Sequence, residues 1–267
     1  MALTKVTGGL LGNLPTGTDN VAVGDTALDS IESGASNNVA IGSAAGTAIT
    51  TGTFNTIVGG LAGDALTTGE RNTVLGKSAL TSDTLGSRAV AVGLSALASQ
   101  NFTTATENYN VAVGYSAGGL ITTGLRNTII GGLAGDALTD ADNNVAVGQA
   151  ALSSDTLGSN SVAIGRNALL TQNFTTATNS YNIAIGSDAG QAITTGVQNT
   201  LVGALAGDSI TTGANNVAIG QNSLSGETTG GRSVAIGVNA LASQNFTGNQ
   251  TPYNVAIGLN AGTAVTT

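Results

Sequence analysis

The sequence predicts an all-β protein that folds as a parallel β-solenoid of about fourteen coils. A short apolar run that ends in glycine recurs fourteen times in the 267 residues. The chain is 41% hydrophobic but only 8% charged and 3% aromatic, and it contains 40 glycines. A repeat this short cannot bury its own faces, so it is stable only when successive copies stack. These observations favour thin, closely packed layers over an ordinary globular core.

The spacing of the apolar runs defines the domain organisation. The runs end at Gly24, Gly42, Gly59, Gly76, Gly93, Gly114, Gly131, Gly148, Gly165, Gly186, Gly203, Gly220, Gly237 and Gly258. After a first interval of 18 residues, the intervals are 17, 17, 17 and 21, three times over. We therefore expect three 72-residue superrepeats, 43–114, 115–186 and 187–258, within a shaft of residues 20–267. Residues 1–19 are expected to be an N-terminal attachment segment.

Each coil follows the pattern N-V-A-I-G-x-x-A-[LG]. In Val39-Ala40-Ile41, the β-branched residues favour a strand, and alternation places Val39 and Ile41 on one face and Ala40 on the other. We expect the larger pair to fill the interior of the coil. The glycine that follows, here Gly42, permits a bend that other residues resist.

An asparagine precedes most of these runs. It begins the copies at Asn38, Asn110, Asn182 and Asn254, whose runs end at Gly42, Gly114, Gly186 and Gly258. Asparagines at the same point of successive coils can form a ladder of stacked amides. Alternatively, asparagine only supplies a turn conformation that it tolerates well. The sequence leaves both interpretations open.

The composition excludes several classes of function. There is no cysteine and no histidine, so neither disulfides nor the commonest metal ligands are available. The net charge of −8 argues against nucleic-acid binding. No apolar stretch is long enough to cross a membrane, and no secretory signal is recognisable. We expect no cofactor, no metal site and no membrane insertion.

The face of the strand opposite the expected interior is also apolar. It carries alanine in most coils and Ile57, Val74, Ile129 or Leu201 in others. Strands that are apolar on both faces are usually covered on both faces. We therefore expect the chain to associate with copies of itself along the axis. The alternative is a monomeric solenoid with an alanine-lined surface.

The N-x-V-A-I-G-x-x-A pattern closely resembles the head repeats of trimeric autotransporter adhesins of the YadA type and related repeats in bacteriophage tail fibres. The resemblance covers about residues 20–262. It implies a left-handed β-roll, packed as a trimer, whose side surface serves adhesion. Coils of 17 or 21 residues, and the lack of a stalk or membrane anchor, depart from the autotransporter pattern. The start MALTKVTGG is similar to the start of many phage tail fibres.

These points predict a structural and adhesive virion tail fibre that mediates host-cell attachment and meets other virion or fibre proteins at either end. An extracellular or cell-surface location is the alternative, as an adhesin head or a self-assembling filament subunit. An ice-binding solenoid is less favoured, because the recurring Thr-Thr pairs precede glycine and are interrupted in every superrepeat. No catalytic constellation stands out, so we expect no enzymatic activity.

Every fourth coil has a longer connection, which concentrates the candidate receptor-binding residues. These candidates are Asn101, Phe102, Tyr109, Asn173, Phe174, Tyr181, Asn245, Phe246 and Tyr253. Loops on rigid scaffolds commonly carry binding, and aromatic faces beside polar side chains suit the sugar rings of a host cell-surface glycan. The competing interpretation is that the aromatic residues fold back and plug the loop. Asp64, Asp136 and Asp208 also recur at 72-residue spacing, and we expect them to cap turns rather than bind a cation.

Overall fold

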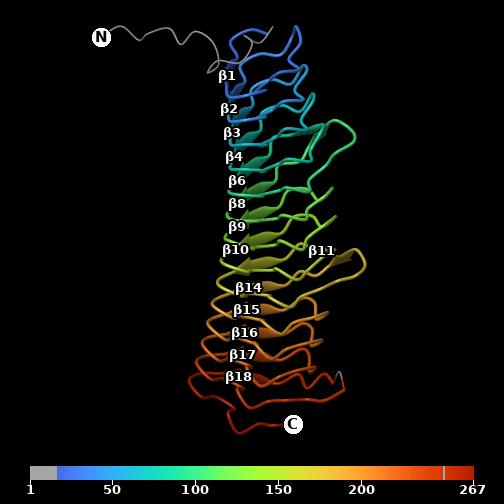
Figure 1. Ribbon diagram of the computed structural model, residues 1–267. Helices are drawn as coiled ribbons and strands as arrows, with labels where there is room; N and C mark the ends of the chain where they lie inside the picture. Colours follow the sequence, from blue (N-terminus) through green and yellow to red (C-terminus); the bar gives the residue numbers. More distant parts are fainter. Residues whose placement is uncertain (1–16, 249) are drawn as a thin grey trace, which may run out of the picture. The chain divides into compact units, whose positions relative to one another are not determined.

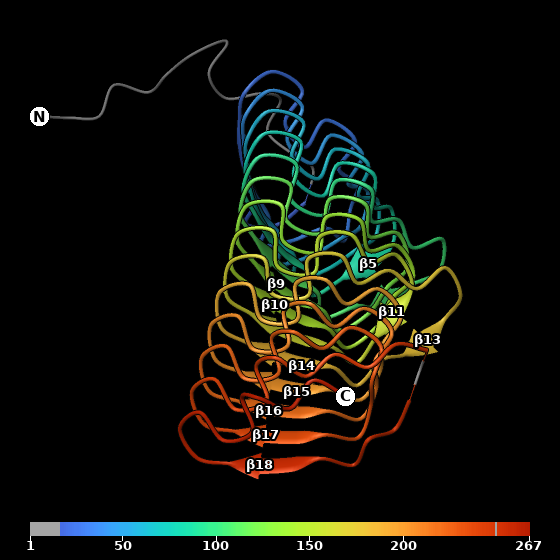
Figure 2. The ribbon, with the colours of Figure 1, turned by 90° about the horizontal axis from the view of Figure 1, so that it is seen from below.

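The computed structural model describes residues 17–248 and 250–267. Within these residues the chain is all-β, contains no helix, and winds as a parallel β-solenoid of about fourteen turns (Figures 1 and 2). The predicted fold class is confirmed. The chain divides into two compact units, residues 1–126 and 127–267.

Unit 1 contains one ladder of three-residue strands and one small two-stranded sheet. The ladder consists of β1 (Val21–Val23), β2 (Val39–Ile41), β3 (Thr56–Val58), β4 (Thr73–Leu75), β6 (Val90–Val92) and β8 (Val111–Val113). Neighbouring strands are parallel and in register, so that Ala40 lies beside Ile57. The small sheet pairs β5 (Gly86–Ser87) with β7 (Thr106–Glu107).

Unit 2 repeats this arrangement. Its ladder consists of β9 (Thr128–Ile130), β10 (Val145–Val147), β12 (Val162–Ile164), β14 (Ile183–Ile185), β15 (Thr200–Val202), β16 (Val217–Ile219), β17 (Val234–Ile236) and β18 (Val255–Ile257). Its small sheet pairs β11 (Gly158–Ser159) with β13 (Thr178–Asn179). In both units the small sheets lie on the side of the coil away from the ladder (Figure 2).

The faces of the strands are reversed relative to the sequence prediction. The middle residue points into the core: Ala40 is fully buried, whereas Ile41 is 40% exposed. The prediction that Val39 and Ile41 fill the interior is wrong. Asn38, one residue before the strand, is also fully buried. Because side chains alternate along a strand, a buried Asn38 places Ala40 inside and the β-branched pair outside.

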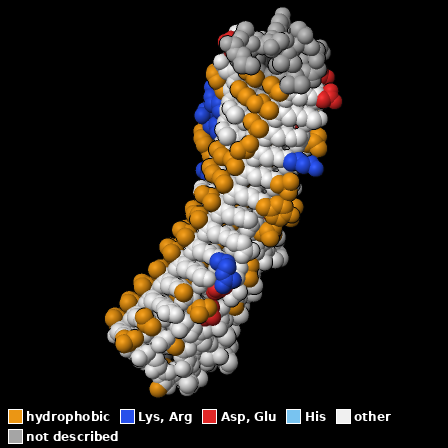
Figure 3. Space-filling model, turned by 60° about the vertical axis from the view of Figure 1, so that its left-hand side comes forward, with side chains coloured by type: hydrophobic (Ala, Val, Ile, Leu, Met, Phe, Trp, Pro, Cys, Tyr) orange, Lys and Arg blue, Asp and Glu red, His pale blue; other side chains and the backbone are white. Residues whose placement is uncertain are grey.

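The outer face of the ladder is therefore lined by valine, isoleucine, leucine and threonine. Exposed members of this set are Val21, Ile41, Leu75, Ile130, Ile164, Ile183, Ile185, Ile219, Val255 and Ile257. Figure 3 shows hydrophobic side chains recurring coil after coil on the surface. The apolar covering that the sequence places inside the coil is in fact presented to the outside.

Two residues after each strand glycine share one space in the core. They stand at the fourth and seventh positions after the glycine, and a small residue at the fourth goes with a large one at the seventh. Where the fourth residue is glycine, as at Gly46, the seventh is a large aliphatic residue, as at Ile49. A Cβ on Gly46 would lie 3.0 Å from Cδ1 of Ile49, so the two positions share one space. Where the fourth residue is leucine, as at Leu80, the seventh is usually polar, as at Asp83, and both are buried. This alternation places carboxylates and amides inside the solenoid.

Two backbone positions close each coil. The strand glycines have positive φ, 138° at Gly42, and a Cβ there would lie 2.5 Å from the carbonyl oxygen of Gly59. Glycine is therefore required by both conformation and space. The residue two positions before each ladder strand also has positive φ, and we call it the corner position. Four corner positions hold arginine and four hold an aromatic residue: Arg71, Arg88, Arg126, Arg232, Phe54, Tyr109, Tyr181 and Tyr253.

Candidate functional site

The three longer connections bulge from the coils, and the structure separates their predicted site residues into two groups. We call them the first, second and third bulge, residues 101–109, 173–181 and 245–253. Phe102 and Phe174 are buried, with 5% and 6% of their surface exposed, and Phe246 is half-buried. The exposed group is Asn101, Asn173, Asn245, Tyr109, Tyr181 and Tyr253. The side chains that a ligand can reach are therefore the asparagines and tyrosines.

A buried carboxylate anchors each bulge. Asp83 Oδ1 accepts hydrogen bonds from the backbone N–H of Gly86 (3.0 Å) and Phe102 (3.1 Å), and Oδ2 accepts one from Gln100 Nε2 (2.6 Å). The carboxylate thereby fixes where the bulge begins. Burial raises the pKa of Asp83 above its usual value, although these hydrogen bonds act in the opposite direction.

The same anchor recurs in the other two bulges. Asp155 bonds Gly158, Gln172 and Phe174, and burial raises the pKa of its carboxyl as well. In the third bulge Glu227 takes the place of aspartate and bonds Gly230, Gln244 and Phe246. Sequence reasoning did not single out these acids. Their 72-residue spacing is the signal that would have found them.

An amide relay connects each anchor to the asparagine of the next coil. Gln100 Oε1 accepts a hydrogen bond from Asn110 Nδ2 (2.9 Å), which also donates to the carbonyl of Gly124 (2.7 Å). Gln172 and Asn182 form the same pair at 2.8 Å, and so do Gln244 and Asn254. The relay ties the base of each bulge to the core.

The asparagines of consecutive coils form a ladder. Asn38 Oδ1 accepts from the backbone N–H (3.0 Å) and Nδ2 (3.1 Å) of Asn55, while Asn38 Nδ2 donates to the carbonyl of Gly52 (2.8 Å). Asn182 and Asn199 repeat this contact in unit 2. A buried amide with all its groups paired stabilises the stack, and losing one partner would leave several polar atoms unpaired.

The first two bulges close onto the preceding coil as a regular pair of short strands. In the first, Asn108 N donates to Ser87 O (3.0 Å), and in the second Ser180 N donates to Ser159 O (2.9 Å). The hydroxyl of Ser87 accepts from the backbone N–H of Glu70 (3.0 Å), and that of Ser159 accepts from the N–H of Asp142 (2.9 Å). These contacts join each of the two bulges to the coil below.

The third bulge keeps one backbone hydrogen bond to the coil, from Gly231 N to Gln250 O (2.9 Å), but it lacks the contacts named above because its residues differ at the equivalent positions. Gly231 replaces the serine and Pro252, which has no N–H, replaces Asn108 and Ser180. The described residues of this bulge form no strand pair. A hollow of about 270 Å³ opens instead. It is lined by Thr212, Ala214, Asn215, Thr229, Gly231, Arg232, Gln250 and Thr251.

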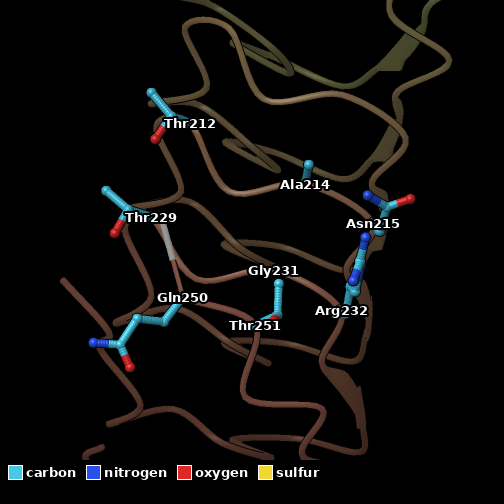
Figure 4. Close-up of a pocket in the computed structure, with 8 residues that line it drawn as sticks. All are labelled: Thr212, Ala214, Asn215, Thr229, Gly231, Arg232, Gln250 and Thr251. Carbon is cyan, nitrogen blue, oxygen red and sulfur yellow. The ribbon is translucent and has the colours of Figure 1, made fainter. Parts of the chain in front are cut away.

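Three successive coils contribute to this hollow, as Figure 4 shows. Ala214 and Gly231 lie in its middle. Asn215 and Arg232 lie one above the other on one side, and Thr212, Thr229 and Gln250 follow one another on the opposite side. The polar groups at its walls are hydroxyls, amides and one guanidinium, and carbon atoms make up the larger part of the lining.

The charge around the corner arginines also differs between the bulges. Arg88 pairs with Glu107 (2.7 Å) and lies over the ring of Tyr109, 5.6 Å from its centroid. Arg232 lies over Tyr253 at 5.6 Å and donates to its hydroxyl (2.6 Å). Within the described residues, Arg232 forms no ion pair with a carboxylate. The acids near Arg88, Glu70 and Glu107, correspond to Ala214 and Thr251 here.

The two tyrosines report this difference in their pKa values. The hydroxyl of Tyr109 donates to Glu107 (2.6 Å), and this hydrogen bond raises the pKa of Tyr109. The hydrogen bond from Arg232 lowers the pKa of Tyr253, because the cation favours the phenolate. The third bulge is therefore more electropositive than the first.

The remaining recurring motifs do not assemble a site. Asp64 accepts from the hydroxyl of Thr81 (2.5 Å), while one carboxylate oxygen each of Asp136 and Asp208 is buried without a partner. Within the described residues, no three carboxylates come together as metal ligands. The first threonine of several Thr-Thr pairs bonds the backbone of the next coil, as Thr67 does with Thr84 (3.0 Å).

In comparisons with known proteins, no family model, no curated protein and no solved structure matches the chain. No helix among the described residues is long and apolar enough to cross a membrane.

Proposed function

We propose that this chain is the shaft of a structural and adhesive fibre: a homotrimer of left-handed β-rolls, acting in host-cell attachment as part of a virion tail fibre. The observation that carries this proposal is the apolar outer face of the strand ladder in each unit. The resemblance of the repeat to trimeric adhesin heads and phage fibres supplies the number of chains and the biological setting.

The outer face is large enough to mark an interface. With about 3.3 Å per residue along a strand and about 4.8 Å between strands, the eight strands of the unit 2 ladder present about 400 Å². Soluble monomers rarely expose contiguous apolar patches larger than a few hundred Å², and patches of about this size are often functional. The two outer residues of every ladder strand are valine, isoleucine, leucine or threonine, and none is charged. Exposing such a face to water is unfavourable along its whole length.

Copies of the same chain are the partners that fit this face best. The apolar residues repeat once per coil, so a partner must carry the same axial repeat to cover every coil in register. Another copy meets this requirement by construction, and closed cyclic symmetry leaves no apolar face exposed. The outer residues of the strands carry no charge and no aromatic ring, so three such ladders can approach one another closely.

The mass in solution tests this proposal. Light scattering beside an unheated denaturing gel should give about three times the chain mass of 25.8 kDa. The double variant Ile164→Lys and Ile219→Lys places two charges on the face, at residues that are 36% and 38% exposed, and should dissociate the trimer. Leu120→Lys is the matched control, because Leu120 is 54% exposed but lies outside the strands.

A monomeric mass for the unaltered protein would overturn the trimer. Loss of association in the Leu120→Lys control alone would move the interface away from the ladder. Binding of the purified trimer to host cells, compared with binding to unrelated bacteria, tests the attachment role. An adhesin head or extracellular filament built on the same trimer would instead bind animal cells or matrix.

A further inference from the structure

The hollow at the third bulge results from specific departures from the repeat. Gly231 removes the serine that fills the same place in the other bulges, and Ala214 removes the neighbouring acid. Pro252 prevents the strand pairing that closes the first two bulges. The changes converge on one place. At Gly231 a Cβ would lie 2.5 Å from the carbonyl oxygen of Ala214, so the preceding coil occupies the place of a side chain there, and the opening lies beside it. The result is a concave surface where the other superrepeats are closed.

The groups around this hollow suit a small, polar, negatively charged ligand. Arg232 presents a guanidinium without a carboxylate partner among the described residues, and a guanidinium binds a carboxylate through two parallel hydrogen bonds. Asn215, Gln250 and Thr251 add amide and hydroxyl groups that match sugar hydroxyls. The exposed ring of Tyr253 lies beside the arginine. A hollow of about 270 Å³ has room for one sugar ring but not for a longer ligand.

We propose that the hollow at the third bulge binds one unit of an acidic glycan, with the carboxylate of the sugar on Arg232. This inference rests on the proposed adhesive function and names the class of receptor. The first bulge does not share the site, since Glu107 neutralises Arg88 and the strand pair fills the space. The second bulge has Asn160 in place of the arginine. Each chain thus carries one such site, and a trimer would gain avidity from three weak contacts.

The test is a titration of the whole chain with glucuronate, using glucose as the neutral match. Single-sugar binding is measured by calorimetry or by NMR shift changes at low salt. We expect glucuronate to bind at millimolar concentrations and glucose to bind at least tenfold more weakly. Arg232→Gln should reduce glucuronate affinity at least tenfold. The matched control, Arg88→Gln, alters the equivalent corner of the first bulge and should leave the affinity unchanged.

A second variant tests the hollow independently of the charge. Replacing Gln250 and Pro252 by the first-bulge residues Thr and Asn, with Gly231 and Thr251 kept, should restore the strand pair and abolish glucuronate binding without adding an acid beside Arg232. The reciprocal exchange in the first bulge, Glu70→Ala and Ser87→Gly with Thr106→Gln, Glu107→Thr and Asn108→Pro, should add a second site per chain. Hydrogen exchange confirms that each variant keeps its coils.

Three outcomes would overturn the proposal: equal binding of glucose and glucuronate, undiminished binding by Arg232→Gln, or no glucuronate binding by the intact fibre. These outcomes are separate from failure of the fibre proposal. A monomer that still binds glucuronate through Arg232 would refute the trimer and leave the site standing. A trimer that attaches to host cells but does not bind glucuronate would refute only the site.

Discussion

The second and third bulges start from the same scaffold and end as different surfaces. Both are anchored by a buried acid and a glutamine, Asp155 with Gln172 and Glu227 with Gln244. The second closes onto the coil below through β11 and β13, whereas the third, in which Pro252 has no N–H to donate, leaves a hollow beside Gly231. The difference shows that the solenoid core and the bulge surface are determined by separate sets of residues. A repeat protein of this kind can therefore change one surface without disturbing the stack.

Burial of the phenylalanine is the largest energetic difference between these two bulges. Phe174 is 6% exposed, while Phe246 is half-buried, so the same substitution should have unequal costs. We expect Phe174→Ala to lower the free energy of unfolding by about 3–5 kcal/mol, from lost burial and the cavity that remains. Phe246→Ala should cost clearly less. Urea unfolding of both variants measures the difference.

Thr175→Ala is the control for this pair, since Thr175 is the exposed neighbour of Phe174. Its effect should stay within about 0.5 kcal/mol, as for most surface substitutions. Equal losses for the two phenylalanine variants would show that the third bulge is packed as tightly as the second, and the contrast between them would fail.

The fold could be predicted from the sequence because its information is local and repeated. The period, the short strands and the glycine bends follow from which residues recur at each point of the coil. The direction in which the strands face could not be obtained from Val39, Ala40 and Ile41 alone, because both faces are apolar. The buried amide of Asn38 decides it, since its partners, the Asn55 amide and the Gly52 carbonyl, belong to the core. The larger size of Val39 and Ile41 did not predict which face is buried, because the narrow interior of the coil accepts the smaller Ala40.

The site was predictable only in part, for a related reason. Sequence reasoning found the bulges and their aromatic residues, but it could not sort Phe174 from Tyr181. That sorting depends on the path of the bulge, which starts at the hydrogen bond from Phe174 N to the buried Asp155. The hollow depends on Gly231 and Pro252, which stand out only when the superrepeats are compared residue by residue. Small departures from a strong repeat carried more information here than the repeat itself.

The proline is the second difference, and it can be transferred to a closed bulge. Asn108→Pro removes the N–H that bonds Ser87 O and the side-chain contacts with Ser87 and Asn110. With about 0.5–1.5 kcal/mol for each lost hydrogen bond, we expect a loss of about 2–3 kcal/mol and an opened first bulge. Urea unfolding and hydrogen exchange at β7 measure both effects. Asn108→Ala, which keeps the N–H, should leave β5 and β7 paired, and identical exchange in the two variants would contradict the role assigned to the proline.

The smallest expected effect is electrostatic, and it compares the first and third bulges directly. Tyr109 donates to Glu107, which raises its pKa, whereas Tyr253 accepts from Arg232, which lowers its pKa. On raising the pH, tyrosinate absorbance should therefore appear first from Tyr253 and last from Tyr109.

Tyr253→Phe should remove the early part of the titration and Tyr109→Phe the late part. Arg232→Gln should shift the early part upward, and Glu107→Gln should shift the late part downward. If the two tyrosines ionised together, Arg232 would not be the unneutralised cation that distinguishes the open bulge, and its assignment as an anion-binding group would lose its electrostatic basis.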